Sequence, residues 1–454
     1  MPPQRRLDVV FDSVKRLQRI GATANLLNLL QKQHPADLAE VFVELPERDR
    51  RAAFDTLLGG NSRLAIEALC ELEPEVGAPL LVDHPAEQLA RLFQEVQSDD
   101  AAAVIGYLPD ELSASVLELM RQKDSDEVQH LLEYADKTAG RIMNPNVFAL
   151  SEDVTAGEAI EALQTSRDVE MVFYLYVVDE RRHLVGVLSL RRLLLVSPET
   201  PLKRIMSTDL MSARVETDQE EVAQVVASYN LLAIPVVDGE NKLVGIITVD
   251  DVIDVIKDEA TEDIYRMAGV SSDEHVFTPA WESLRKRLPW LGVNLVTAVL
   301  AALVVRLFQS TIDHVVALAA FMTIVASMGG NAATQTLTVI VRGIALGDLT
   351  WSNSRQALVK EALVGFGNGL ILGIAGAGVA WWVVGNLYFG GILALAMVIN
   401  LLVAAVAATL IPFGLRAIKV DPALASSVFI TTLTDMFGFF AFLGLATFFV
   451  QYLE

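Results

Sequence analysis

The most informative reactive group in this 454-residue chain is Asp435, a carboxylate inside an apolar stretch near the C-terminal end. It follows Thr431-Thr432-Leu433-Thr434 and precedes an almost wholly apolar run to Val450. A charged side chain at the centre of a bilayer costs roughly 2.5–3.5 kcal/mol on insertion scales. No Lys or Arg follows Lys419 to neutralise it. A cation in a water-filled path would do so. The alternative is a protonated or interfacial Asp that makes only a structural hydrogen bond.

A second polar segment, GGNAATQT from Gly329 to Thr336, lies inside another apolar stretch. Two adjacent glycines followed by Asn, Thr and Gln are unusual in a lipid-facing helix. They favour a break in the helix whose backbone and amides line a cavity. The same residues also fit close helix packing through small side chains, with Asn331 and Gln335 as hydrogen-bonding groups between helices.

The remaining acids gather in the first 280 residues. Residues 281–454 hold nine Lys/Arg and seven Asp/Glu, which leaves 26 basic and 50 acidic residues, a formal charge of −24, in residues 1–280. Such a surface excludes nucleic acid as a partner and attracts cations. Bound divalent cations would screen this repulsion and stabilise a compact state. The single cysteine excludes a disulfide framework and a Cys-based metal site.

Five apolar stretches are long enough to cross a bilayer, which takes about 20 residues; they are 288–308, 315–341, 360–384, 391–413 and 423–450. Basic residues lie before the first stretch, in the second connection and after the fourth. The positive-inside rule therefore predicts an inner (plasma) membrane protein with a cytoplasmic N-terminal half and an external C-terminus. MPPQRRLDVV has no apolar run after its basic residues, so we expect no signal peptide.

Residues 1–130 are predicted to be helical, because apolar residues recur every three or four positions. A loose repeat opens each time with a proline turn and an acid: HPADLAEVFVELP, HPAEQLARLFQEV and LPDELSASVLELM. Stacked helical pairs in a small superhelix would give this pattern.

A β-α-β-β-α pattern then occurs twice, and VVDERRHLVGVLSLRRLL aligns with VVDGENKLVGIITVDDVI. The unit resembles the CBS domain, and the tandem resembles a CBS pair. Gly245, Thr248 and Asp251 fit the family's ribose-and-phosphate pattern, which implies that Thr248 and Asp251 could bind ATP or another adenine nucleotide. The first copy has Arg192 at the position of that Asp. Both segments also fit a purely structural turn.

The order of these parts resembles the MgtE family of magnesium channels over nearly the whole chain. The most specific stretches are DKTAGRIMNP, DEATEDIYRMAGV, MGGNAATQT, DPALASS and TDMFGFFAF. The expected fold is a multidomain membrane protein: an all-α superhelical N domain, an α/β tandem CBS pair, a connecting plug helix and a five-helix transmembrane domain. We assign the N domain to residues 1–135, the two CBS domains to 136–200 and 201–256, the plug helix to 257–284 and the transmembrane domain to 285–454.

The resemblance implies a homodimer with one shared pore lined by the second and fifth spans, and a plug helix that shuts it when cytosolic Mg²⁺ is high. Asp435 would hold the ion, and Thr431 would contribute a backbone carbonyl. Mg²⁺ retains its waters and prefers octahedral oxygen ligands, so two symmetry-related carboxylates suit the hydrated ion. The acids that match the family's regulatory Mg²⁺ sites are Glu67, Asp99, Asp218, Glu220, Asp251, Asp254, Glu262 and Asp263. The chain departs from the family's pattern at Asn230, Thr323, Ala333 and Val428.

Two other functions fit parts of the sequence. A transporter of another divalent cation, Co²⁺ or Mn²⁺, would use the same oxygen ligands. A membrane-anchored CBS nucleotide sensor would transport nothing, but it would have no use for a carboxylate deep in its last span. An enzyme is excluded by the lack of P-loop, GxSxG and HExxH motifs.

Overall fold

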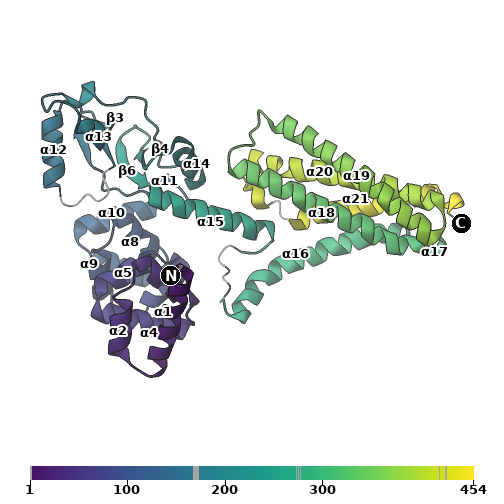
Figure 1. Cartoon of the computed structure of the whole chain (residues 1–454), viewed down its shortest axis with the longest axis horizontal. Coiled ribbons are helices and arrows are strands. Elements are labelled where there is room, and N and C mark those ends of the chain that lie inside the picture. The colour runs from purple at the N-terminus through teal and green to yellow at the C-terminus, as the bar shows by residue number, and fades with distance from the viewer. Residues whose placement is uncertain are drawn as a thin grey trace. The chain divides into compact units, whose positions relative to one another are not determined.

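The structure is a computed structural model that describes residues 3–166, 173–271, 274, 276, 278–418, 420–424 and 427–453. The chain divides into two compact units, Met1–Ile256 and Lys257–Glu454. The first unit holds the predicted helical domain and the two predicted α/β repeats, and the second holds five long apolar helices (Figure 1). The predicted fold class is confirmed.

The N-terminal part of the first unit is a stack of short helices. They are α1 (Pro3–Arg19), α2 (Thr23–Leu30), α3 (Pro35–Glu44), α4 (Glu47–Gly60), α5 (Ser62–Cys70), α6 (Pro74–Leu81), α7 (Ala86–Phe93), α8 (Ser98–Ile105), α9 (Asp110–Leu119) and α10 (Gln122–Glu133). Helix α3 packs on α5, α5 on α7 and α7 on α9. Helices α3, α7 and α9 open the three predicted repeats, and a proline stands at or beside each start because its fixed φ suits a helix N-terminus. The predicted stacking of helices is confirmed.

Each α/β repeat forms a three-stranded sheet. After α11 (Ala139–Ile142), the first copy contains β1 (Ala149–Ser151), α12 (Ala156–Thr165), β2 (Tyr174–Val178), β3 (Leu184–Ser189) and α13 (Leu190–Leu193). The 3₁₀ turn η1 (Leu202–Arg204) leads to the second copy, which contains β4 (Ala213–Arg214), α14 (Gln219–Tyr229), β5 (Ala233–Val237), β6 (Leu243–Thr248) and α15 (Val249–Met267). In both sheets the first strand is parallel to the second, and the second is antiparallel to the third.

The helical domain and the second α/β repeat share one hydrophobic core within the first unit. The connection between them is fixed by backbone hydrogen bonds. The Gly140 amide donates to the Val215 carbonyl at 2.9 Å, and Asn144 exchanges two bonds with Ile246 of β6 at 2.7 and 2.9 Å. Asn144 therefore holds the chain next to the strand that leads into α15. This geometry brings α8 of the helical domain close to the start of α15.

The second unit contains the five predicted spans, and their number is confirmed. They are α16 (Ala280–Leu307), α18 (Ala317–Ala345), α19 (Ser354–Val384), α20 (Leu387–Ala417) and α21 (Ser427–Phe448). Short helical segments α17 (Gln309–His314), η2 (Pro422–Leu424) and η3 (Val450–Tyr452) accompany them. In Figure 1, α18, α19, α20 and α21 run alongside one another, and α20 packs against each of the other three.

Helices α19 and α20 pack through a ridge of glycines at four-residue spacing. A Cβ atom built on Gly365 would lie 2.7 Å from the Leu401 carbonyl oxygen, one on Gly369 2.7 Å from the Val398 Cα, and one on Gly373 2.9 Å from the Ala394 carbonyl oxygen. Small residues let the helix backbones approach closely, which drives association where the surrounding lipid is as apolar as the side chains.

The predicted helix break at Gly329-Gly330 is wrong. Helix α18 is continuous from Ala317 to Ala345. Gly329 is buried because a side chain of α20 fills the space that its own side chain would occupy. Asn331 and Gln335 are exposed in the single chain, so they do not join helices within it.

Candidate ion-binding sites

Asp435 lies near the middle of α21, one turn after Thr431, and its side chain is half-buried in the single chain. The adjacent Thr434 is fully buried and donates its hydroxyl to the Thr431 carbonyl at 2.9 Å. Among the described residues, none pairs with the Asp435 carboxylate or donates a hydrogen bond to it. The described part of the chain therefore supplies no compensation for this acid, and a cation, water or a proton would have to do so.

Thr431 sits where α21 meets α18. Its hydroxyl donates to the Val428 carbonyl at 3.2 Å, and a Cβ built on Gly330 would lie 3.4 Å from the Thr431 Cγ2. The Thr431 carbonyl accepts the Thr434 hydroxyl in addition to the Asp435 amide, its regular partner in a continuous helix. Thr431 and Asp435 are one helical turn apart, so they lie on the same side of α21.

The exposed side of α18 is polar along much of its length. Thr323, Ser327, Asn331, Thr334 and Thr338 are all exposed, at spacings of three and four residues. Residues at this spacing share one face of a helix. A membrane helix with a polar outer face requires water or another protein surface against that face.

In the first unit, the structure brings Asp99 of α8 near Asp251 of α15. Burial, together with the neighbouring Asp100 and Asp251 carboxylates, raises the pKa of Asp99 well above its usual range. Burial and the nearby Asp250 and Asp254 raise the pKa of Asp251 to about 6, although hydrogen bonds from Thr248 oppose this. Two carboxylates that resist ionisation beside one another are stabilised by a cation between them.

The Asp251 carboxylate also caps its own helix. Its Oδ2 accepts the Thr248 hydroxyl at 2.7 Å and the Thr248 amide at 3.3 Å. Both predicted nucleotide residues are therefore joined at the start of α15, and the Thr248 hydroxyl is held by the carboxylate three residues on. The Asn144 side chain, 3.5 Å from the Asp99 Oδ1, links the other acid to the β6 edge.

The other predicted regulatory acids of the first unit differ in their hydrogen-bond partners and in their exposure. Asp218 is exposed and caps α14 by accepting the Glu220 amide at 2.8 Å, while Glu220 is partly buried in the first turn. Glu67 accepts a hydrogen bond from Arg63 at 2.9 Å, and Asp254 is exposed. Over the described ranges, no three His, Cys, Asp or Glu side chains converge as direct metal ligands.

The segment of α15 that belongs to the second unit carries Glu262 and Asp263. Glu262 is buried and forms an ion pair with Arg266, which also pairs with Asp421 just before η2. Burial and the nearby Glu259 raise the pKa of Asp263. Met267 packs against the apolar cluster of α18 and α20 that contains Leu337 and Ala404. The end of α15 is therefore attached to the transmembrane helices by both charge and apolar contacts.

Two buried polar residues of the membrane unit were not predicted as sites. The sequence favours Glu361 as a helix-end residue, but its carboxylate is buried, accepts the Thr336 hydroxyl at 3.1 Å and pairs with Lys360 at 2.5 Å. Asn400 is fully buried in the middle of α20. The signal for Asn400 was available, because it is the one amide in an apolar stretch without charge between Tyr388 and Arg416.

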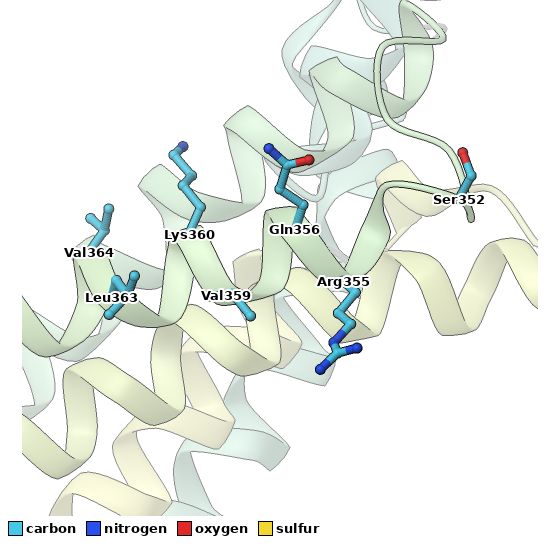
Figure 2. Close-up of a pocket in the computed structure, with 7 residues that line it drawn as sticks. All are labelled: Ser352, Arg355, Gln356, Val359, Lys360, Leu363 and Val364. Atoms are coloured by element: carbon cyan, nitrogen blue, oxygen red, sulfur yellow. The ribbon is translucent and has the colours of Figure 1, made fainter.

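A hollow lies on α19, and one of its lining residues, Lys360, is the ion-pair partner of Glu361. Figure 2 shows its lining residues, which come from the start of α19 and the turn before it: Ser352, Arg355, Gln356, Val359, Lys360, Leu363 and Val364. None of the seven is a carboxylate, so the hollow lacks the ligands that a divalent cation prefers.

Three family models match the chain. A model described as a divalent cation transporter, MgtE, matches residues 322–445, and one described as the MgtE intracellular N domain matches residues 33–137. The CBS domain model matches residues 139–199 and 202–258. These ranges cover both units.

Relatives match at nearly full length. The magnesium transporter MgtE of Bacillus subtilis is 33% identical over 442 residues, which covers 96% of both chains. The magnesium transporter MgtE of Thermus thermophilus is 33% identical over 449 residues, 96% of this chain and 97% of that protein. A crystal structure of the cytosolic domain of the Mg²⁺ channel MgtE in complex with ATP is 35% identical and covers 54% of this chain and 99% of that one, with a TM-score of 0.49. With relatives of this identity and coverage, the chain belongs to the MgtE family of magnesium transporters and is not an enzyme.

Proposed function

We propose that this protein is a magnesium-selective channel or transporter for Mg²⁺ uptake, and that cytosolic Mg²⁺ shuts it by binding to the acidic N and CBS domains. The observation that carries the proposal is the Asp435 carboxylate, which lies half-buried in a membrane helix and has no partner among the described residues. An ion that crosses the membrane beside α21 would be the missing counter-charge. Thr431, one turn away, would add a carbonyl oxygen.

The polar face of α18 supports a pore shared by a homodimer. In the single chain this face, which includes Asn331 and Thr334, is exposed. Two copies related by a two-fold axis would turn these faces, and the two Asp435 carboxylates, toward one water-filled path. Hydrated Mg²⁺ holds its waters tightly, so two carboxylates acting through water suit it better than a closed cage of protein ligands.

The distribution of charge supports regulation by the same ion. Residues 1–280 carry a formal charge of −24, and within them Asp99 and Asp251 approach each other closely enough to raise the pKa of Asp99. A divalent cation between Asp99 and Asp251 would relieve the repulsion of this pair and part of the repulsion within the acidic half. It would stabilise whichever state holds the acids together. The remaining acids proposed for regulatory Mg²⁺ are Glu67, Asp218, Glu220, Asp254, Glu262 and Asp263.

We further propose that the cytoplasm contains the N-terminal half and that the C-terminus lies outside. The basic residues Arg285, Lys286 and Arg287 precede the first span, and Arg355 and Lys360 follow the second, as the positive-inside rule requires for cytoplasmic ends. The segment of α15 from Lys257 to Met267 would then lie at the cytoplasmic end of the pore, where its contacts with α18 and α20 suit a plug.

Binding of ATP or another adenine nucleotide at Thr248 and Asp251 stays a prediction. The Thr248 hydroxyl and the Asp251 carboxylate are joined by a 2.7 Å hydrogen bond at a helix start. Titration calorimetry of the full chain with ATP, repeated on Thr248→Val, would measure this site. We expect the variant to lose nucleotide binding.

The ion path is tested by uptake into liposomes that contain the purified chain. Mg²⁺, Mn²⁺ and Co²⁺ are supplied separately, and we expect Mg²⁺ uptake to be the fastest. Asp435→Ala and the isosteric Asp435→Asn should both abolish uptake, because each removes the charge that compensates the ion. Asp348→Ala is the matched control, since Asp348 is an exposed acid in the connection between α18 and α19.

Three results would count against the proposal. Mn²⁺ or Co²⁺ uptake that clearly exceeded Mg²⁺ uptake would transfer the function to another divalent cation. Equal uptake by the wild type and Asp435→Ala would remove Asp435 from the ion path. No uptake of any ion by the folded wild type would favour a membrane-anchored sensor.

A further inference from the structure

Asn400 is a fully buried amide at the centre of the most apolar span, α20. Its Nδ2 donates to the Val325 carbonyl of α18 at 2.9 Å. That carbonyl faces Gly329, four residues on, which is its partner in a regular helix. A Cβ built on Gly329 would lie 2.2 Å from the Asn400 Nδ2. The glycine therefore leaves the carbonyl open to the amide of the neighbouring helix.

The same amide also fills a notch in α21. A Cβ built on Gly438 would lie 2.7 Å from the Asn400 Nδ2 and 3.0 Å from its Cγ. Any side chain at Gly329 or Gly438 would have to displace Asn400. Because α18, α20 and α21 pack against one another in pairs, one side chain of α20 fills a notch in each of the other two helices.

The position of this contact relative to Asp435 gives it a functional meaning. Helix α21 meets α18 directly where Thr431 contacts Gly330, and indirectly where Gly438 and Gly329 share Asn400. Asp435 lies between Thr431 and Gly438 in the sequence of α21, so its carboxylate is carried by a segment that is held at both ends. A binding group performs as intended only when its neighbours lock it to within about 0.5 Å.

We propose that Asn400 is a positioning residue for ion discrimination: by holding α18 and α21 at a fixed spacing, it fixes where the Asp435 carboxylate stands. This inference rests on the proposed ion path. Mg²⁺ demands near-ideal octahedral geometry and keeps its waters. If the Asp435 carboxylate were held less firmly, the site would lose its preference for Mg²⁺. Uptake of ions that exchange their waters more readily would then rise relative to Mg²⁺ uptake.

The Asn400 Oδ1 makes the test sharper. It is buried and has no hydrogen-bond donor among the described residues. An unsatisfied buried acceptor destabilises the folded state, so removing the amide does not threaten folding as the loss of a fully bonded group would. Effects on stability and on discrimination can thus be separated in the same variants.

The experiment compares Co²⁺ and Mg²⁺ uptake by liposomes that contain the full chain, for wild type, Asn400→Ala and Asn400→Leu. The first variant empties the notch, and the second fills it without a hydrogen bond. Thr409→Val is the matched control, because Thr409 is also fully buried on α20 but its hydroxyl bonds only to its own helix, at the Ala405 carbonyl (2.8 Å). Thermal unfolding in detergent reports folding of each variant.

We expect the ratio of Co²⁺ to Mg²⁺ uptake to rise at least about threefold in both Asn400 variants, the factor that an interhelical hydrogen bond of average strength represents. Thr409→Val should keep the wild-type ratio. An unchanged ratio in Asn400 variants, with uptake reduced only in proportion to the folded fraction, would overturn the proposal. Normal uptake by Asp435→Ala would instead refute the ion path itself, which keeps the two failures distinct.

Discussion

Replacing Asp251 by Asn should make the contact between α8 and α15 more stable in the absence of Mg²⁺. Burial and neighbouring acids raise the pKa of Asp251 to about 6, against an ordinary value of about 3.9. Each pKa unit corresponds to about 1.4 kcal/mol, so ionised Asp251 disfavours the folded state by about 3 kcal/mol. The pKa shift is already net of the opposing Thr248 hydrogen bonds, and Asn keeps an acceptor for Thr248 without the charge.

The stabilisation expected of Asp251→Asn is therefore at most about 3 kcal/mol, and each 1.4 kcal/mol of it lowers the population of the locally open state about tenfold. Hydrogen exchange of the full chain in detergent at pH 7.5 with a chelator measures this at peptides that cover α8 and residues 249–256. Adding Mg²⁺ should slow exchange in the wild type and have less effect in the variant, because the ion and the substitution relieve the same repulsion.

The sign of the pH dependence follows from the same shift. The folded state binds the Asp251 proton more tightly than the unfolded chain does, so its contribution to stability is fully present below about pH 4 and is lost as the pH rises through about 6. The wild type should exchange more slowly at pH 5 than at pH 7.5 after correction for intrinsic rates, and Asp251→Asn should lose most of this difference.

Asp250→Asn is the matched control for this experiment. Asp250 is exposed and lies in the first turn of α15, where its negative charge stabilises the N-terminal end of the helix. This stabilisation offsets the repulsion between Asp250 and Asp251. We expect its removal to leave exchange unchanged or slightly faster. If Asp251→Asn also exchanged as fast as the wild type in the chelator, or faster, the repulsion between Asp99 and Asp251 would not be the force that Mg²⁺ relieves.

Two further predictions concern the membrane unit. Gly369→Ala should lower the thermal unfolding temperature in detergent, because the new Cβ would meet the α20 backbone. Gly367→Ala, whose Cβ would meet nothing within 4 Å, should raise that temperature slightly through the higher helix propensity of Ala. Equal shifts in the two variants would refute the role of the glycine ridge. Arg266→Ala should leave the buried Glu262 without its ion pair and free α15 from Asp421, so liposomes loaded with high Mg²⁺ should keep taking up the ion. Uptake that stays inhibited as in wild type would show that this ion pair does not hold a closed state.

The sequence alone determined the parts of this protein and their order. Apolar length defines membrane spans because a bilayer has a fixed thickness, and the duplicated strand pattern defines the α/β repeats because a strand alternates its faces every residue. Asp435 stood out for the same reason: a charge in an apolar span is costly wherever the span packs.

Tertiary structure decided which residues meet. Gly329 and Gly438 lie 109 positions apart, and only the packing of the helices reveals that both make room for the Asn400 side chain. The adjacent glycines Gly329-Gly330, which indicated a broken helix, lie in a continuous helix with a notch at Gly329. Asp99 and Asp251 likewise become a pair only when α8 reaches α15. Local patterns record the preference of a segment for lipid, water or a helix, whereas electrostatic coupling and close packing depend on distances that the chain sets only once it has folded.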